Sequence, residues 1–479
     1  MKNKKFKGIS TLTLHTATKE NDNSSHTTPI YATSTFTFDT AEEGMERFAG
    51  TDKTKLYTRW GNPTFAAAEQ TLEALEAHGL TNEKGEPLQL KALLHSSGQA
   101  AMTTLFFSNL SAGDTLISHY SLYGGSQELM QKVLVEAGVK IILIDIHNEQ
   151  LLLDTIKANP STKLIHLETP ANPTLQCVDI ESICKIAHAH GVKVSVDNTV
   201  ATPYLQQPFA LGADFVFHSA TKFLNGHGSA LHGVMLGKDL EFMNKKAWKW
   251  HALMGGNSNA FDAYLLIQGM KTLEVRMERH CSNTAKVANF LAAHPAIAHV
   301  NYTGLATHPH HEIAKKQMKQ HAPLISFELK GGIEAGKKFI NAVEVCTRAV
   351  SLGTVDTLVS HPASMTHMSI PKEERIKYDK IIQMNSKVSY PAFRTDTEAK
   401  EGQWLTKIVT DYYKSKPVII RTSGGSVPIS PFVSELGVPA IGVPTVNLDN
   451  NQHSPNENLR LGNYFMGIET FLAILTTAF

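Results

Sequence analysis

The chain has 479 residues, of which 42% are hydrophobic and 19% charged, an ordinary composition for a globular protein. Its 45 basic and 44 acidic side chains give a formal charge of +1, so nothing in the electrostatics indicates nucleic acid or a membrane surface as a partner. At this length we expect one large enzyme subunit or two to three domains.

The cysteines and the first residues indicate a cytoplasmic protein. The four cysteines lie at no spacing typical of a metal finger or a redox motif, so we expect reduced thiols and no metal site. The basic start, Met1 to Lys5, is followed by no apolar signal core. No stretch approaches the roughly 18 apolar residues of a membrane helix.

The first 240 residues predict an arm followed by an α/β domain. Residues 1–60 predict an extended arm, because 24–37 is rich in Ser, Thr and Tyr and has little helical periodicity. Helices are predicted at 64–78, 98–107, 127–137, 149–158 and 180–190, and strands at 91–95, 115–118, 139–144, 163–167, 192–196 and 214–217. This alternation predicts a mostly parallel sheet that is covered on both faces and that binds ligands at the carboxyl ends of its strands.

The next segment predicts a smaller α+β domain. Residues 259–295 form a long helical pattern, 324–330 alternate as a strand, and a helix is predicted at about 334–343.

Two reactive side chains follow strand patterns. Asp197 closes the apolar run 192–196, and Lys222 follows the run 214–217 within His218-Ser219-Ala220-Thr221-Lys222. Pyridoxal phosphate (PLP) needs such a pair, since a lysine amine bonds to its aldehyde and a carboxylate keeps its ring nitrogen protonated. Asp197 alone is more often a structural turn residue, but the order and setting of the pair favour PLP.

Three more segments offer cofactor contacts, each with a structural alternative. Gly98, where a strand pattern enters a helix, suits an anion at a helix N-terminus, although Ser97 also suits a plain helix cap. The ring of Tyr123 suits stacking on the cofactor, or simple packing. Asn172 suits the ring hydroxyl, while the neighbouring X-Pro steps also favour a rigid structural turn.

These motifs together are similar to those of the Cys/Met-metabolism PLP family, which includes cystathionine γ-synthase, O-acylhomoserine sulfhydrylase and methionine γ-lyase. The resemblance covers about residues 7–378. It is carried by many segments in one order: Tyr57 to Thr64, Ser97-Gly98-Gln99, Glu168 to Pro173, Val196 to Thr199, His218 to Lys222, Gly269 to Leu273, Arg348 to Gly353 and His361 to His367.

The resemblance implies an aspartate aminotransferase-like fold and a role for each matching residue. Lys222 is the cofactor-linked lysine that also moves protons, Asp197 the partner of the ring nitrogen, and Tyr123 the stacking ring. The phosphate binders are Gly98, Gln99, Ser219 and Thr221. Tyr57 and Arg59 reach the phosphate of the neighbouring subunit, Tyr57 also handles protons near the substrate γ-carbon, and Ser351 contacts the substrate carboxylate. Shared active sites imply a dimer, and a homotetramer built from two such dimers.

The implied substrate is a small four-carbon amino acid. Typical methionine γ-lyases carry a cysteine at the position of Gly125. We therefore favour γ-replacement on an O-acylhomoserine, giving cystathionine or homocysteine, over methionine γ-elimination.

The last hundred residues resemble a different family. The segments Tyr390 to Thr395, Pro417 to Pro428 and Gln452 to Glu457 resemble the C-terminal end of zinc dipeptidase/aminoacylase-type metallopeptidases. This predicts a chimera of an arm (1–60), a PLP-binding domain (61–258), a truncated small domain (259–378) and a foreign segment (379–479). The arginine that clamps the substrate carboxylate is absent from its usual place, so an inactive PLP-binding remnant is a further alternative. Arg421 is not expected to replace it, and a metallopeptidase is less favoured, because His453 alone makes no zinc site.

Overall fold

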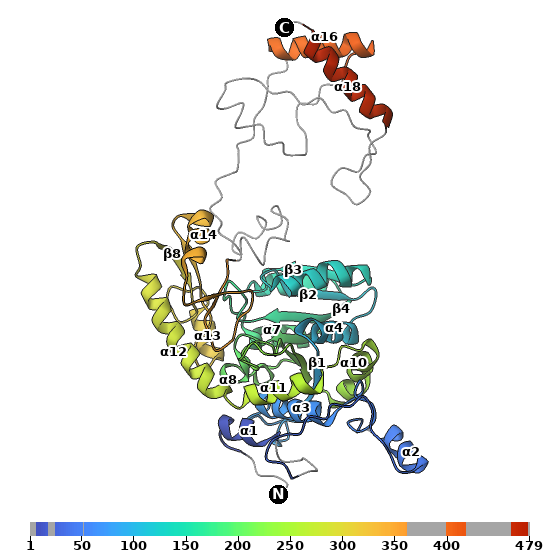
Figure 1. Ribbon diagram of the computed structural model, residues 1–479, viewed down its shortest axis with the longest axis vertical. Coiled ribbons are helices and arrows are strands. Elements are labelled where there is room, and N and C mark those ends of the chain that lie inside the picture. Colours follow the sequence, from blue (N-terminus) through green and yellow to red (C-terminus); the bar gives the residue numbers. More distant parts are fainter. Residues whose placement is uncertain (1–5, 18–23, 51, 362–398, 418–460, 478–479) are drawn as a thin grey trace. The chain divides into compact units, whose positions relative to one another are not determined.

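The computed structural model describes residues 6–17, 24–50, 52–361, 399–417 and 461–477 (Figure 1). The chain divides into two compact units, Met1–Met384 and Asn385–Phe479.

The first unit contains a seven-stranded sheet in the order β1-β7-β6-β5-β4-β2-β3 (Figure 1). All neighbouring pairs are parallel except those of β7, which runs antiparallel to both β1 and β6. The strands are β1 (Lys91–His95), β2 (Thr115–His119), β3 (Lys140–Ile144), β4 (Thr162–Glu168), β5 (Lys193–Asp197), β6 (Phe215–His218) and β7 (Gly233–Gly237). Six strands therefore point the same way and end at one edge of the sheet.

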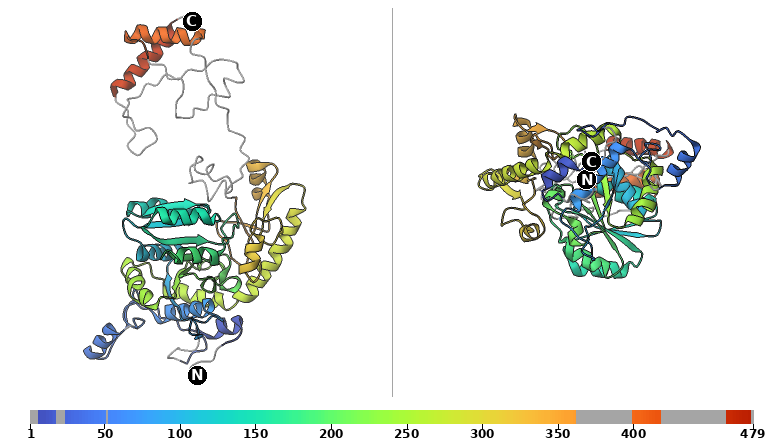
Figure 2. Two further views of the ribbon diagram at one scale, coloured as in Figure 1. Left: turned by 180° about the vertical axis from the view of Figure 1, so that it is seen from behind. Right: turned by 90° about the horizontal axis from the view of Figure 1, so that it is seen from below.

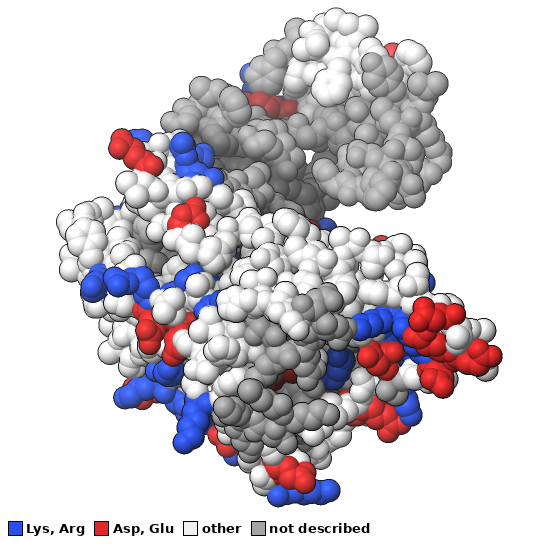
Figure 3. Space-filling model, turned by 60° about the horizontal axis from the view of Figure 1, so that its bottom comes forward, with Lys and Arg blue, Asp and Glu red and all other residues white. Residues whose placement is uncertain are grey.

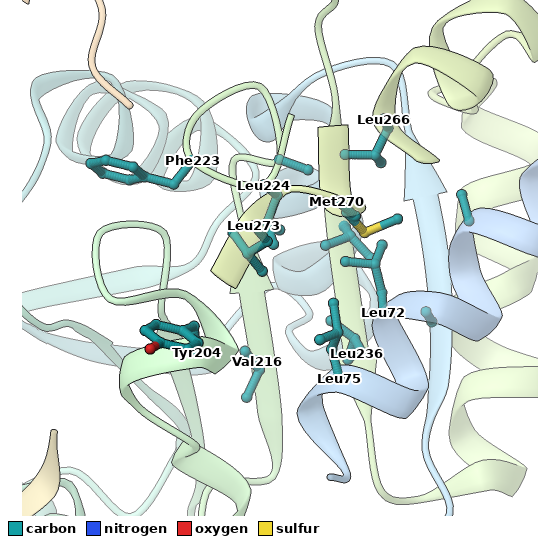
Figure 4. Close-up of a cluster of buried hydrophobic side chains, with 14 of the residues drawn as sticks. Leu72, Leu75, Tyr204, Val216, Phe223, Leu224, Leu236, Leu266, Met270 and Leu273 are labelled. Atoms are coloured by element: carbon teal, nitrogen blue, oxygen red, sulfur yellow. The ribbon is translucent and has the colours of Figure 1, made fainter. Parts of the chain in front are cut away.

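Helices cover both faces of this sheet (Figures 1 and 2). Successive side chains of a strand point to opposite faces, and the buried residues divide accordingly. Leu93, Leu116 and Phe217 pack with helix α4 (Gly98–Asn109) on one face. Leu94 and Val216 pack on the other face with α3 (Pro63–Glu76) and α11 (Ala260–Met270), as Figure 4 shows for part of this cluster. The predicted doubly covered, mostly parallel sheet is thus confirmed.

The other helices of the sheet region follow the strands in sequence. They are α5 (Gly124–Glu128), which continues as a π-helical turn over Leu129–Leu134, then α6 (Glu149–Ala158), α7 (Ile180–His188), α8 (Thr202–Leu205), α9 (Leu240–Phe242) and α10 (Trp248–Met254). The helix predicted at 127–137 is therefore wrong in two respects. It begins earlier, at Gly124, and it is π-helical rather than α-helical over Leu129–Leu134.

The smaller α+β part is built on α12 (Leu273–Ala292), which packs against the two-stranded sheet of β8 (Ile297–Asn301) and β9 (Ser326–Leu329). The helices α13 (His311–Gln317) and α14 (Gly332–Ala342) and the short strands β10 (Thr347–Arg348) and β11 (Leu358–Val359) complete its described portion. The predicted long helix at 259–295 is interrupted at Lys271-Thr272, where the chain passes from α11 to α12.

The predicted extended arm is partly wrong. Residues 1–60 contain the helices α1 (Ile9–His15) and α2 (Ala41–Ala49). Helix α2 begins with a cap by Thr40, whose side chain accepts a hydrogen bond from the backbone of Glu43. The polar composition that suggested an arm hid this capping pattern.

In the second unit, the described residues form α16 (Lys400–Tyr413) and α18 (Leu461–Thr476). The tyrosine hydroxyl of Tyr413 hydrogen-bonds the hydroxyl of Thr470 at 2.7 Å, which ties the two helices together. The peptidase-like segments at 390–395, 418–428 and 452–457, with Arg421 and His453, lie outside the described residues, as does the expected end of the small domain.

Two general features complete the description. Among the described residues, no helix is long and apolar enough to cross a membrane. Basic and acidic side chains are interspersed on the face drawn in Figure 3, rather than segregated into one field.

Candidate active site

The carboxyl ends of β4, β5 and β6 bring the reactive side chains together. In the sheet register Glu168, the last residue of β4, stands beside Asp197, the last residue of β5, and Asp197 stands beside Phe217 of β6. The turn after β6 carries Ser219 and Lys222. The structure therefore has Asp197 and Lys222 at one edge of the sheet, as the sequence predicted.

The amine of Lys222 lies between the two parts of the first unit. Its Nζ donates a hydrogen bond of 2.9 Å to Oγ of Ser351, which comes from the smaller part. Burial lowers the pKa of the Lys222 amine below its ordinary value. The chain after Ser351 packs directly on the lysine turn, because a Cβ added to Gly353 would lie 2.5 Å from the backbone nitrogen of Phe223.

Asp197 is 8% exposed and is linked to the lysine turn through Thr199. Its Oδ1 accepts the backbone N–H of Thr199 at 2.9 Å, and the hydroxyl of Thr199 accepts the backbone N–H of Ser219 at 2.8 Å. Burial raises the pKa of Asp197, while the hydrogen bonds from Thr199 and the nearby His218 oppose this rise. Asp197 forms no ion pair within the part of the chain that the structure describes.

The N-terminus of α4 adjoins Ser219. A Cβ added to Gly98 would lie 3.0 Å from Oγ of Ser219, so glycine lets the helix end approach the lysine turn. Ser97 caps this helix by accepting the backbone N–H of Ala100 at 3.2 Å, so the cap that was the structural alternative is present as well. The first N–H groups of a helix form a site for an anion.

Gln99 and Tyr123 converge on Gly125. A Cβ added there would lie 2.4 Å from Nε2 of Gln99 and 2.6 Å from Cε1 of Tyr123. Tyr123 is 47% exposed, so part of its side chain is accessible to a ligand.

The remaining residues expected near the cofactor are placed as follows. The hydroxyl of Thr221 donates to the backbone oxygen of His232 at 3.1 Å and accepts from its nitrogen at 2.9 Å. The backbone N–H of Asn172 donates to Oε1 of Glu168 at 2.9 Å. The hydroxyl of Thr221 is thus bonded to the segment just before β7, whereas Asn172 is fixed beside the strand ends.

Among the described residues, Tyr57 and Arg59 contact each other and residues outside the Lys222 cluster. Arg59 donates to the backbone oxygen of Ala252 at 2.5 Å, and its guanidinium lies 5.6 Å from the ring centre of Tyr57. The side chain of Tyr57 is 42% exposed.

Three structural groups around the site were missed at the level of sequence. The carboxylate of Glu168 accepts hydrogen bonds from two loops, and its place at a strand end beside Asp197 was the signal that could have found it. The buried pair of His218 and Glu76, 2.6 Å apart, joins the lysine motif to α3. Arg276 of α12 donates to the backbone oxygens of Phe223 and Leu224 at 2.6 and 3.3 Å. No local pattern predicts these last two contacts.

The residues present fit PLP. A buried carboxylate without a cation, Asp197, calls for a positive partner, which a protonated pyridine nitrogen supplies. The amine of Lys222, with a lowered pKa, suits attack on an aldehyde. The close approach of Gly98 to Ser219 leaves a helix N-terminus next to hydroxyl groups for a phosphate.

This doubly covered sheet, with a lysine and a carboxylate at its strand ends, defines a PLP-dependent enzyme. Residues 10–384 match the family model described as Cys/Met metabolism PLP-dependent enzyme. The chain belongs to this family, whose members act on small amino-acid substrates.

Named relatives support the same assignment. The chain is 45% identical over 381 residues to an L-methionine gamma-lyase of Fusobacterium nucleatum subsp. polymorphum, which covers 78% of this chain and 92% of the relative. It is 42% identical over 349 residues to a cystathionine beta-lyase of Lactococcus lactis subsp. cremoris, covering 72% and 85%.

A solved structure extends the likeness to the fold. A cystathionine gamma synthase from Xanthomonas oryzae pv. oryzae, in complex with aminoacrylate and cysteine, has a TM-score of 0.71 and 32% identity, covering 78% of this chain and 91% of that one. The chain is thus an enzyme of the carbon–sulfur lyase and synthase group.

Proposed function

We propose that this enzyme cleaves the carbon–sulfur bond of L-methionine by γ-elimination. The observation that carries the proposal is the 45% identity to methionine γ-lyases of two organisms, over 92% and 90% of their lengths. This weighs against the preference for γ-replacement, which rested on Gly125 alone. The reaction converts methionine and water into methanethiol, ammonia and a four-carbon 2-oxo acid.

The proposed roles follow from the placement of the side chains. When bound, PLP supplies an electron sink for negative charge that develops on the substrate. Lys222 holds the cofactor covalently and then carries protons between the α- and β-carbons, which a lowered pKa favours because the neutral amine is the base. Asp197 would hold the ring nitrogen, and the ring of Tyr123 would contact the cofactor ring.

Polar groups around the lysine are proposed to contact the cofactor's hydroxyl and phosphate and the substrate's carboxylate. Asn172 contacts the ring hydroxyl of the cofactor, and Ser351, within reach of the lysine amine, contacts the substrate carboxylate. The phosphate is held by Gly98, Gln99, Ser219 and Thr221. For Thr221 this requires its hydroxyl to exchange the His232 carbonyl for a phosphate oxygen.

We infer that two chains share each site, with Tyr57 and Arg59 acting on the neighbouring subunit's cofactor, and that two such dimers form a tetramer. The contact of Arg59 with Ala252 and with the ring of Tyr57, rather than with the Lys222 cluster, supports this. Mixing inactive Tyr57→Phe and Lys222→Ala subunits tests it. One site of each hybrid dimer then carries both intact residues, so activity returns, whereas sites built from one chain would stay inactive.

The substrate is tested with the purified full chain. We expect a visible band of bound cofactor that is lost in Lys222→Ala, and release of the 2-oxo acid and methanethiol from L-methionine alone. If the cofactor binds but neither methionine nor an O-acylhomoserine reacts, the chain is an inactive remnant that lacks its carboxylate clamp.

The second candidate is γ-replacement on an O-acylhomoserine. It is favoured by Gly125, where a side chain would collide with Gln99 and Tyr123, and by the likeness to a cystathionine gamma synthase. Thiol-dependent formation of cystathionine or homocysteine, without 2-oxo acid in the absence of thiol, would establish it in place of the lyase.

We propose no catalytic role for the C-terminal segment that resembles a peptidase. The family model covers residues 10–384 and the first compact unit is Met1–Met384, and no comparison matches the last hundred residues to a peptidase. We expect no zinc-dependent cleavage of dipeptides, and a zinc-stimulated rate that a chelator abolishes would contradict this.

A further inference from the structure

The buried carboxylate of Glu168 accepts hydrogen bonds from the backbone of two different loops. The residue ends β4 and is 4% exposed. Its Oε2 accepts the backbone N–H of Tyr123 at 2.7 Å, and its Oε1 accepts the backbone N–H of Asn172 at 2.9 Å. One carboxylate therefore joins two loops that follow different strands, β2 and β4.

Because Glu168 is buried, these two hydrogen bonds are the main interactions that offset the cost of removing its carboxylate from water. Burial, and after it the neighbouring Asp197, raise the pKa of Glu168, and the two backbone N–H groups oppose the rise. Glu168 forms no ion pair with any described lysine, arginine or histidine. A buried carboxylate in such a place is costly unless hydrogen bonds satisfy it, so the two loops and the carboxylate hold each other in place.

We propose that Glu168 is a positioning residue that sets where the ring of Tyr123 and the amide of Asn172 meet the cofactor. The inference rests on the cofactor contacts proposed above for those two residues. The N–H groups that Glu168 accepts belong to Tyr123 and Asn172 themselves, so a change in either backbone moves the side chain that it carries. A displacement of about 1 Å at a supporting group is enough to impair such a site.

Glu168→Gln tests the geometry with little change in shape. An amide has one oxygen, so it accepts one backbone N–H, and its NH₂ group then faces the other donor. One loop must therefore move. The matched control is Glu73→Gln, because Glu73 also accepts a backbone N–H from a strand, that of Ala92 at 2.8 Å, but on α3 away from the site.

Two measurements separate positioning from general folding. Titration of the cofactor-free protein with PLP gives the dissociation constant, and circular dichroism in the visible band reports the orientation of the bound ring. For Glu168→Gln we expect at least roughly tenfold weaker PLP binding and a reduced visible signal, with far-ultraviolet dichroism unchanged. Tenfold corresponds to about 1.4 kcal/mol, the scale of one lost hydrogen bond. Glu73→Gln should keep both wild-type values.

The outcomes are assigned as follows. PLP affinity within twofold of wild type and an unchanged visible signal in Glu168→Gln would overturn the inference. If that variant does not fold, Glu168→Asp replaces it: the carboxylate is retained but is one methylene shorter, so weaker binding supports the inference and unchanged binding overturns it. Lys222→Ala serves as the separate test of the proposed function. If it retains the visible band, the cofactor assignment fails, whereas loss there with no effect at Glu168 rejects the positioning role alone.

Discussion

The amine of Lys222 and the hydroxyl of Ser351 lie 2.9 Å apart across the boundary between the two parts of the first unit, although 129 residues separate them in sequence. This contact joins the residue proposed to hold the cofactor to the residue proposed to hold the substrate.

Ser351→Ala should weaken substrate binding more than it slows the reaction. The change removes one hydroxyl that meets charged groups, a contribution of about 1.5 kcal/mol, so we expect KM to rise roughly tenfold and kcat to change less. Steady-state rates with L-methionine measure this. Ser351→Thr, which retains the hydroxyl, is the control, and an unchanged KM in Ser351→Ala would exclude a substrate contact.

Gly125→Ala should loosen the cofactor site. The added Cβ would lie 2.4 Å from Nε2 of Gln99 and 2.6 Å from Cε1 of Tyr123, so one of these side chains must move. We expect PLP affinity to fall several-fold in an equilibrium titration. Gly8→Ala, whose new Cβ meets only a hydroxyl at 3.7 Å, is the control, and equal affinities in the two variants would contradict the expectation.

Arg276→Met should destabilise the turn that follows Lys222. The guanidinium also donates to the backbone oxygen of Gly269 at 2.8 Å, and burial lowers its pKa to about 10. Removing it leaves several buried carbonyls without donors, so we expect the free energy of unfolding to drop by about 3 kcal/mol. Denaturant unfolding measures the loss. Arg276→Lys should restore part of it, because an ammonium group still donates but lacks the planar fork. Equal stabilities of Arg276→Met and wild type would refute the role.

Acid should destabilise the protein between about pH 6.5 and 4. Burial lowers the pKa of His119 and His251 to about 4, and that of His166 and His310 to about 3. Unfolded histidines titrate near about 6.5, so in this window the unfolded chain binds more protons and the free energy of unfolding falls as the pH falls.

Glu168 acts with the opposite sign. Its pKa is raised above the unfolded value of about 4.3, so above that pH the folded chain holds the extra proton and the contribution of Glu168 favours folding at lower pH. The histidines outnumber Glu168, so we expect the free energy of unfolding to fall as the pH is lowered. Urea unfolding at pH 7, 6 and 5 measures the slope. His251→Gln should reduce it by up to about one proton, and a flat profile in the wild type would count against the whole argument.

Much of the fold was predictable because local patterns decide it. The apolar run at 91–95 predicted strand β1, and the helical pattern at 149–158 predicted helix α6, each with the bounds that the structure has. The ends of the strand patterns that became β5 and β6 located Asp197 and Lys222. Carboxyl ends of parallel strands must meet at one edge, so these two residues had to lie together.

The support around the pair was not predictable in this way. Thr199 lies two residues from Asp197, yet its link to Ser219 depends on how β5 and β6 are paired. Arg276 reaches the lysine turn only after α12 packs against it, and a buried cation among carbonyl oxygens has no pattern in a single sequence. The helix α2 was missed because a polar composition outweighed its cap at Thr40.

The contacts of the turn after Lys222 also bear on when the cofactor can be captured during biosynthesis. A nascent chain that has emerged only as far as Lys222 already has the strands that carry Asp197, but it lacks Arg276, which binds the carbonyls of the turn, and Ser351, which receives the amine. The lysine gains its final surroundings only after the ribosome has added more than a hundred further residues. The turn that carries Lys222 therefore has all of these contacts only in a chain that extends at least to residue 351, and we expect a product that ends earlier to hold PLP less firmly.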